Sequence, residues 1–177
     1  MLTIIGIIVL AVAGILVYAS MQPDDFRITR SATVRATAER VFPHIADLRA
    51  WGAWSPWEKK DPGMKRTFSG PASGVGAAYA WEGNKDVGSG RMEVTEAIAS
   101  SKVVIRLEFL KPFAATHMAE FTLQPQGDST TVDWAMYGKH PFLGKVMCLF
   151  MNMDKMVGKD FEAGLASLKD VTEKPAS

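Results

Sequence analysis

The feature that most constrains this chain is an uninterrupted apolar run at its start. Leu2 to Ala19 contains no charged residue and is rich in Ile, Val, Leu, Ala and Gly. At 1.5 Å of rise per residue, a helix over this run is about 27 Å long, close to the roughly 30 Å of a bilayer's hydrocarbon core. A helix that is apolar on every side suits lipid better than the surface of a globular core. The sequence therefore predicts a transmembrane anchor over residues 1–21.

The same run has a second interpretation, a signal peptide cleaved after Ala19. Signal peptides usually begin with basic residues, and no Lys or Arg precedes this run, which favours the uncleaved anchor. Arg27, Arg30, Arg35 and Arg40 follow the run. By the positive-inside rule alone, these arginines would keep the following domain in the cytoplasm.

Composition narrows the functions open to the rest of the chain. The 20 Lys and Arg balance the 19 Asp and Glu, giving a formal net charge of +1, so we expect no nucleic-acid partner. Cys148 is the only cysteine, which excludes an intramolecular disulfide, and its apolar neighbours predict a buried, unreactive thiol. His44, His117 and His140 lack the spacing of metal ligands, so we expect no metal and no cofactor.

Alternation of apolar and polar residues predicts a sheet. Turn-forming residues at 22–25 predict a linker, and period two then begins with a strand from Phe26 to Ala36. Short connections and the lack of a crossover helix predict an antiparallel meander. Six further segments with this period follow, at 65–69, 77–82, 90–97, 103–109, 116–123 and 130–137.

Helical periodicity flanks these strands on both sides. Thr37 is a candidate N-cap for a helix whose apolar positions include Val41 and Ile45, and Pro43 predicts a late start or a kink in it. From Phe142 to about Val171 the spacing predicts one long amphipathic helix, with any break falling near Asn152.

Together these elements predict an α+β domain, a curved antiparallel sheet of about seven strands wrapped on a long C-terminal helix and preceded by a transmembrane helix. The expected boundaries are 1–21 for the anchor, 22–25 for the linker, 26–171 for the domain and 172–177 for a disordered tail. Space left between the sheet and the long helix would form a pocket for a lipophilic small molecule or lipid. Alternation cannot distinguish such a pocket from a solid core built of the same side chains. The expected ligand-binding residues are Trp54, Trp57, Tyr79, Trp81, Met92, Ile105, Leu107, Phe109, Phe121, Trp134, Met136, Met153, Met156, Val157 and Phe161.

Two other classes of function stay open at this stage. The first is an enzyme, a cyclase or dehydratase acting on a polyketide-like substrate, although no catalytic constellation is present. His117 is its one weak catalytic candidate, because it shares the inward phase of its strand, and a lone His on an apolar face is more often a core residue. The second is a protein-interaction module that uses the segment Trp51 to Trp57, with an unknown protein partner.

Several strings resemble one known family. Trp54 to Glu58, Tyr79 to Asn84, Gly90 to Met92, Leu107 to Phe109 and Met153 to Phe161 resemble the bacterial polyketide cyclase/dehydrase and lipid-transport branch, the SRPBCC proteins, of the START/Bet v 1-like superfamily.

This resemblance covers nearly all of residues 26–168 and implies the helix-grip fold. It also implies an apolar pocket between the sheet and the last helix, and no shared catalytic triad. Such relatives often begin with a Lys-bearing anchor that places the domain outside the cytoplasm. The resemblance therefore favours an extracytoplasmic domain, although this chain lacks that Lys.

Overall fold

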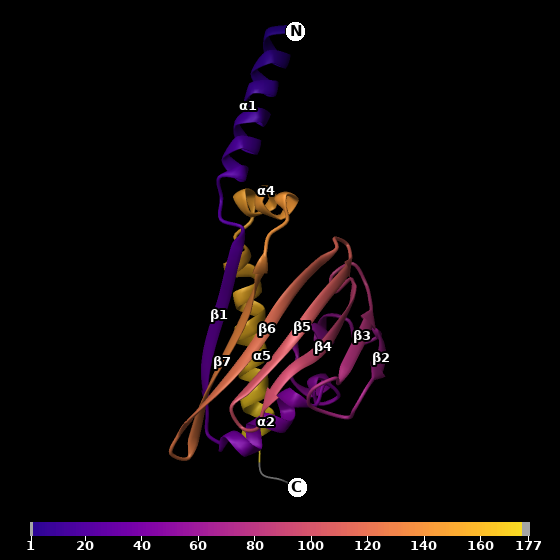
Figure 1. Cartoon of the computed structure of the whole chain (residues 1–177), viewed down its shortest axis with the longest axis vertical. Coiled ribbons are helices and arrows are strands. Elements are labelled where there is room, and N and C mark those ends of the chain that lie inside the picture. The colour runs from indigo at the N-terminus through magenta and orange to yellow at the C-terminus, as the bar shows by residue number, and fades with distance from the viewer. Residues whose placement is uncertain (1, 175–177) are drawn as a thin grey trace.

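A computed structural model describes residues 2–174 of the protein (Figure 1). An N-terminal helix is followed by a sheet whose first two strands are separated by short helices, and two further helices end the chain. The elements in order are α1 (Leu2–Ser20), β1 (Asp25–Val34), α2 (Ala38–Ala46), the 3-10 turn η1 (Ala50–Ala53), α3 (Pro56–Lys60), β2 (Lys65–Ser69), β3 (Ala78–Glu82), β4 (Ser89–Ile98), β5 (Lys102–Lys111), β6 (Ala115–Gln126), β7 (Ser129–Lys139), α4 (Phe142–Phe150) and α5 (Met153–Glu173).

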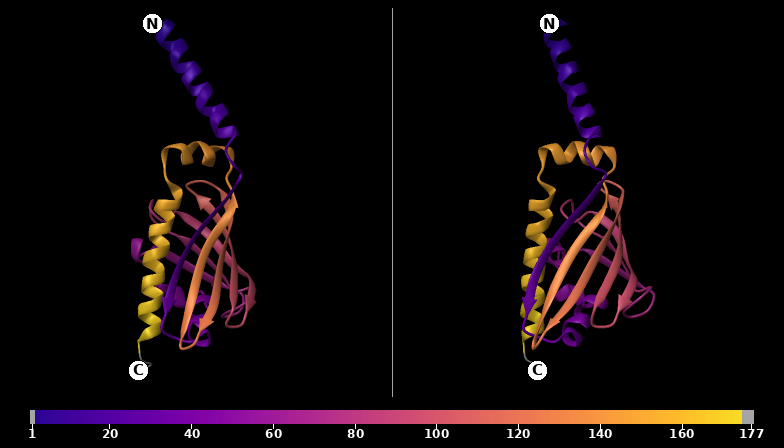
Figure 2. Two further views of the ribbon diagram at one scale, coloured as in Figure 1. Left: turned by 90° about the vertical axis from the view of Figure 1, so that its left-hand side faces the viewer. Right: turned by 60° about the vertical axis from the view of Figure 1, so that its left-hand side comes forward.

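The seven strands form one antiparallel sheet in the order β1-β7-β6-β5-β4-β3-β2. Consecutive strands from β2 to β7 are neighbours, which confirms the predicted meander, and β1 closes the sheet by pairing with β7. The sheet curves around α5, which lies against its concave side (Figure 2). The predicted α+β architecture of a seven-stranded sheet on a long C-terminal helix is confirmed.

The C-terminal helical region is two helices, where the sequence predicted one with a break near Asn152. α4 ends at Phe150, and the Asn152 side chain caps α5 by accepting a hydrogen bond from the Lys155 backbone N–H at 2.8 Å. α4 lies across one end of the domain, between α1 and the sheet (Figures 1 and 2). This break creates an elbow that the continuous apolar periodicity concealed.

Two helix boundaries differ from the expected ones. α2 starts at Ala38 and runs through Pro43, so the proline neither delays the helix nor ends it. α5 continues through Thr172 and Glu173, two residues into the segment expected to be a tail, and the Thr172 hydroxyl donates to the Leu168 carbonyl at 2.7 Å. Residues 175–177 of that segment lie outside the described residues.

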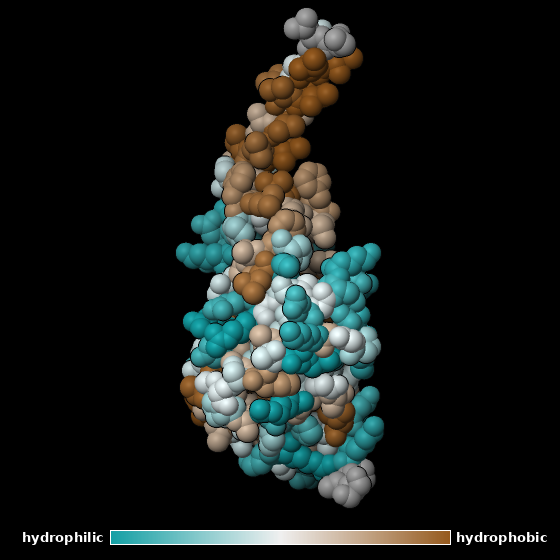
Figure 3. Space-filling model, turned by 90° about the vertical axis from the view of Figure 1, so that its right-hand side faces the viewer, coloured by the Kyte–Doolittle hydropathy of each residue, from teal (hydrophilic) through white to brown (hydrophobic). Residues whose placement is uncertain are grey.

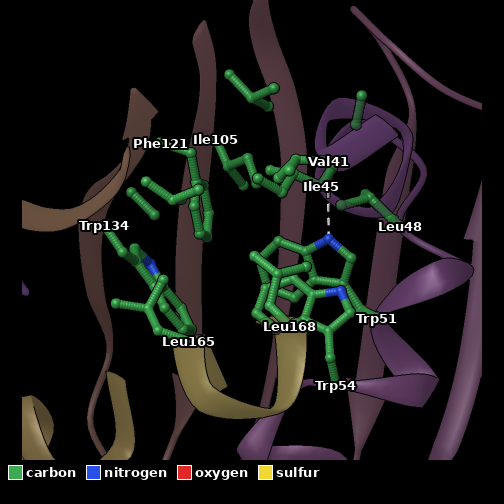
Figure 4. Packing of buried hydrophobic residues seen from close by; sticks show 14 of the residues in the cluster. Val41, Ile45, Leu48, Trp51, Trp54, Ile105, Phe121, Trp134, Leu165 and Leu168 are labelled. Carbon is green, nitrogen blue, oxygen red and sulfur yellow. Dashed lines mark hydrogen bonds between the residues drawn. The ribbon is translucent and has the colours of Figure 1, made fainter. Parts of the chain in front are cut away.

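The core fills the end of the sheet that faces α2. Trp51 and Trp54 enter it from η1 and from the connection to α3, and Phe121 and Trp134 enter it from the sheet (Figure 4). The indole N–H of Trp51 donates to the Ile45 carbonyl at 3.0 Å, so this Trp is held by a hydrogen bond as well as by packing. This end of the concave face is consequently solid.

Helix α1 projects from the opposite end of the domain (Figure 1). Its apolar side chains are exposed on all sides, except that Ala19 is buried where the helix ends beside α4. Thr3–Ser20 is long and apolar enough to cross a membrane, and a signal sequence would pass the same test. The structure therefore establishes one apolar N-terminal helix.

Candidate functional site

Exposure of the concave face rises along the strands toward α4. On β5, Ile105 is fully buried, whereas Leu107 and Phe109 on the same face are half-buried. On β6, Phe121 is fully buried and His117, four residues closer to the α4 end, is half-buried. The α2 end is sealed by the tryptophan cluster, so the α4 end is where the interior of the fold becomes accessible.

A pocket of about 650 Å³ lies at this accessible end, in the angle between α4 and α5. We call it the elbow pocket. It joins the start of β1, the residue after β7 and the α4–α5 junction. It is open to solvent on one side, and its walls expose slightly more polar than apolar surface. Its lining residues are Phe26, Arg27, Ile28, His140 and residues 148–154. Pockets that hold small molecules typically have volumes of roughly 300–1,000 Å³ and predominantly apolar walls, so this pocket has the usual volume and a more polar lining.

Aromatic side chains connect the elbow pocket to the concave face. Phe26 lines the pocket and meets the His117 ring edge-on, with 4.8 Å between ring centroids. His117 lies 5.7 Å from Phe109, which lies 5.9 Å from Trp81. A ligand in the pocket would therefore reach the half-buried part of the sheet by displacing or passing Phe26.

Two basic side chains hold the walls of the pocket in place. Lys145 is a buried residue of α4. It donates to the Gln22 carbonyl at 2.9 Å and pairs with Asp24, and these contacts fasten α4 to the linker. Arg30 on β1 pairs with Asp154 at 3.0 Å and with Glu162 at 2.8 Å, which fastens the first turns of α5 to the sheet. The hydrogen bond from Arg30 lowers the pKa of Asp154 below its usual range, so that carboxylate stays charged at neutral pH.

Gly158 is needed where Arg30 crosses α5. A Cβ at this position would lie 2.0 Å from an Arg30 guanidinium nitrogen, so any larger residue would push the guanidinium aside.

A second pocket, of about 560 Å³, lies on the other side of the elbow between α3 and α5. It is lined by Lys60, Met151, Asn152, Lys155, Met156, Lys159 and Asp160.

The predicted ligand-binding residues fall into three groups in the structure. Met153 lines the elbow pocket, whereas Met156 is 47% exposed and lines the second pocket, on the side of α5 away from the sheet. A partly buried group faces the accessible α4 end or flanks the core: Trp57, Trp81, Leu107, Phe109 and Val157. The remaining residues are buried in the core: Trp54, Tyr79, Met92, Ile105, Phe121, Trp134, Met136 and Phe161.

Sequence reasoning missed most of the elbow pocket. Phe26, His140, Cys148 and Leu149 come from three elements that are far apart in the chain, and no spacing relates them. The one available signal was Asn152, a strong capping residue near which any break in the helix was expected. The angle between α4 and α5, which creates the pocket, had no signal in the sequence.

His117 lacks the surroundings of a catalytic acid or base. Both of its ring nitrogens are buried without a hydrogen-bond partner among the described residues, and it lines neither pocket. Burial, with a smaller effect of His140, lowers the pKa of His117 below its ordinary value, so the ring is neutral near pH 7. A proton-transfer role would need a partner that fixes the ring's orientation, so the weak catalytic candidate is not supported.

Cys148 has the surroundings of an unreactive thiol. Its Sγ lies 3.7 Å from His140 Nε2, but burial raises the pKa of the thiol and lowers that of His140. The pair is therefore neutral at pH 7, which disfavours a thiolate nucleophile. Among residues 2–174, no group of three or more His, Cys, Asp or Glu side chains is placed to hold a metal ion.

Replacing His117 by leucine is expected to remove part of the acid sensitivity of the fold. The pKa of His117 is lower in the folded chain than in the unfolded chain, where it is about 6.5. Below that pH the unfolded state binds more protons, so folding stability falls as the pH drops from 7 toward 5. The free energy of unfolding, measured with urea at pH 7 and pH 5, should fall less between the two pH values for His117→Leu than for the wild type.

At pH 7 the same variant should be about as stable as the wild type, because leucine removes two buried nitrogens that make no hydrogen bond within residues 2–174. His44 and His140 are present in both proteins, so the difference between the two pH dependences reports on His117 together with its electrostatic coupling to His140. An identical pH dependence of the two proteins would show that His117 does not titrate in this way.

The tryptophan segment does not form a docking patch. Trp51 and Trp54 are buried, and the Trp54 indole donates to the His44 carbonyl at 2.9 Å. Trp57 is half-buried with its ring edge against Trp134 at 5.7 Å. The exposed aromatic patch on which the interaction-module alternative depends is therefore missing at these three positions.

Known structures share this fold. An NMR structure from Thermobifida fusca has a TM-score of 0.62 at 20% identity, covering 82% of this chain and 92% of that one. Protein CV1439 from Chromobacterium violaceum has a TM-score of 0.61 at 14% identity, covering 87% of this chain and 100% of that one. CalU16 from Micromonospora echinospora has a TM-score of 0.58 at 14% identity, covering 85% of this chain and 76% of that one. At these identities the likeness establishes the helix-grip, Bet v 1-like fold class.

The family follows from the sequence itself. The profile described as "Polyketide cyclase / dehydrase and lipid transport" matches residues 25–173, which is most of the chain. The protein therefore belongs to this SRPBCC family, which typically binds hydrophobic ligands, and the predicted resemblance is confirmed. No curated protein matches the chain.

Proposed function

We propose that this protein binds a lipophilic small molecule or lipid in the elbow pocket and that α1 tethers it to a membrane. The observation that carries the proposal is the pocket of about 650 Å³, which opens at the end of the domain from which α1 leaves. Membership of a family that typically binds hydrophobic ligands supports the choice of ligand class.

The lining of the pocket suits an amphiphilic ligand. Phe26, Ile28, Leu149 and Met153 offer apolar and polarizable surface to a hydrocarbon portion, whose burial yields about 25 cal/mol per Å². Among the polar lining residues, His140 and Asn152 would meet a polar head group, whereas the Arg27 guanidinium is already paired with Glu120 at 2.9 Å. The site therefore favours a molecule with one long apolar part and one polar end.

The exposed surface of α1 supports the tether. Its isoleucines, leucines and valines are accessible around the whole helix, and in water that area would be an aggregation hazard. Hydrocarbon would cover it without any change in the fold, because a helix satisfies its own backbone hydrogen bonds. A tether at this position also keeps the elbow pocket close to a store of lipophilic molecules.

Native mass spectrometry of the full chain purified from membranes tests the binding. We expect wild type to retain a one-to-one lipophilic adduct and Cys148→Phe to lose it, because the new ring would occupy the pocket. Displacing roughly 100 Å² of buried ligand surface costs about 2.5 kcal/mol at 25 cal/mol per Å², more than a tenfold loss of affinity.

Met156→Phe is the matched control, since it adds a ring on the other side of the elbow, in the second pocket. It should keep the adduct. Equal retention by wild type, Cys148→Phe and Met156→Phe would place the bound molecule elsewhere, and a wild type with no adduct after mild purification would contradict ligand binding itself.

A further inference from the structure

Helix α4 has two faces of different character. At about 100° per residue, positions 142, 143, 146 and 150 fall within one arc of about 100°. Phe142 is 50% exposed and Leu143 55%, whereas Phe150, at the end of the helix, is 71% exposed and also borders the elbow pocket. On the opposite side, Lys145 is buried and Cys148 lines the elbow pocket. The exposed apolar face of α4 therefore points away from the domain.

The position of α4 relative to α1 is fixed by contacts. Lys145 fastens α4 to Gln22 and Asp24 in the linker that follows α1, and the last turn of α1 buries Ala19 beside α4. Because the linker is short and held in this way, α4 lies across the foot of α1 (Figure 1). Its exposed face is thus on the side of the domain from which α1 leaves.

A second apolar projection lies at the same end of the sheet. The end of β5 carries Leu110, 63% exposed, and the turn between β5 and β6 carries Phe113, 55% exposed. This turn is next to the start of β6, which pairs with the end of β7 just before α4, as the partnership of His117 with Gly138 shows. Both projections therefore belong to one end of the domain.

The occupant that fits these surfaces is a lipid bilayer. The hydrophobic surface of α1 continues onto the adjoining end of the domain (Figure 3). Below that end, the visible face is mostly hydrophilic or neutral, with a few separate hydrophobic residues. Lys111 and Lys139 are exposed at this end of the strands and are placed to meet lipid phosphates. A short amphipathic helix beside a spanning helix matches an element that lies in the membrane interface.

We propose that the outer face of α4 and the tip of the β5–β6 turn rest in the surface of the bilayer that α1 enters. The inference rests on the proposed tether and adds a docking surface to it. α4 then forms a wall between the bilayer and the elbow pocket, with Phe142 and Leu143 in lipid, Cys148 on the pocket side and Phe150 at the edge between the two. A lipid could pass between bilayer and pocket at the edge of this helix without crossing water.

Depth-dependent fluorescence quenching tests the docking. In the full chain carrying Cys148→Ser, single cysteines are introduced by Phe142→Cys and Leu143→Cys on α4, Leu10→Cys in α1 and Asp128→Cys in the β6–β7 turn at the far end. Each is labelled with an environment-sensitive fluorophore and reconstituted into phosphatidylcholine vesicles with or without doxyl-labelled phosphatidylcholine. Circular dichroism checks that each variant is folded.

We expect blue-shifted emission and strong quenching by the doxyl lipid at 10, 142 and 143, and neither effect at 128. Quenching at 10 with water-like emission at 142 and 143 would overturn the docking of α4 and leave the tether standing. Blue-shifted but unquenched labels at 142 and 143 would also overturn it, by placing a second copy or another protein on this face. An unquenched label at 10 would overturn the tether and the docking together.

Discussion

Replacing Trp134 by alanine is expected to lower the free energy of unfolding by about 3–5 kcal/mol, the usual cost of emptying a buried aromatic site. The Trp134 ring is buried and stacks on Phe161, with centroids 4.2 Å apart and planes 7° apart. It also stacks on Phe121 at 4.8 Å and meets the edge of Trp54 at 5.5 Å. No neighbour can collapse into the space without leaving its own partners.

This loss would be a large part of the total free energy of unfolding of a domain of this size, which is typically about 5–15 kcal/mol. Trp134→Phe is the matched control: it keeps an aromatic ring and removes an indole N–H that has no hydrogen-bond partner among the described residues. Trp134→Phe should lower the free energy of unfolding clearly less than Trp134→Ala does. Urea unfolding of the full chain in mild detergent measures all three proteins, and a Trp134→Ala midpoint equal to that of wild type would contradict the packing described.

The second large effect is expected for charges in the middle of α1. Leu10 lies near the centre of the span Thr3–Ser20, and 74% of its surface is exposed. Each arginine at the centre of a spanning helix costs about 2.5–3.5 kcal/mol on the insertion scale, so Leu10→Arg with Val12→Arg should cost about 5–7 kcal/mol. The double variant should leave the membrane fraction.

Met21→Arg is the control, because it places one charge just beyond the span, where a long side chain reaches water. Wild type and this control should sediment with membranes after carbonate extraction, and the double variant should not. Release of the wild type, or a mature protein whose mass corresponds to an N-terminus at Ser20, would identify α1 as a cleaved signal sequence.

The fold was predictable because its determinants are local. Alternation over short segments, with hairpin connections such as that between β6 and β7, specified seven strands and the antiparallel neighbours from β2 to β7, whereas the pairing of β1 with β7 came only from the structure. The exceptions are positions where one residue overrides a continuous pattern. Asn152 ends an apolar periodicity that otherwise runs through two helices, and Met156 keeps the apolar spacing although it faces away from the sheet.

The site was much less predictable because it depends on what the side chains leave empty. The same alternation places Phe121 and Phe109 on one face, but only the structure reveals that the first is sealed and the second half-exposed. Lys145 gives the clearest example: a lone charge in an apolar helix suggests a solvated side chain, yet it lies buried and fixes α4 through Asp24. Such tertiary contacts have no periodic signature.

The central claim is that a lipophilic molecule occupies the elbow pocket, and the single cysteine of the chain reports on it directly. Cys148 lines that pocket, so its rate of alkylation by a maleimide is measured in the full chain in nanodiscs, before and after addition of oleate, phosphatidylglycerol or a menaquinone. The reference protein carries Cys148→Ser with Met156→Cys, which reports from outside the pocket. We predict that at least one of these molecules slows alkylation of Cys148 in a saturable way and leaves the reference rate unchanged. Equal rates at Cys148 with and without every molecule, in protein shown by mass spectrometry to have one bound, would contradict the claim.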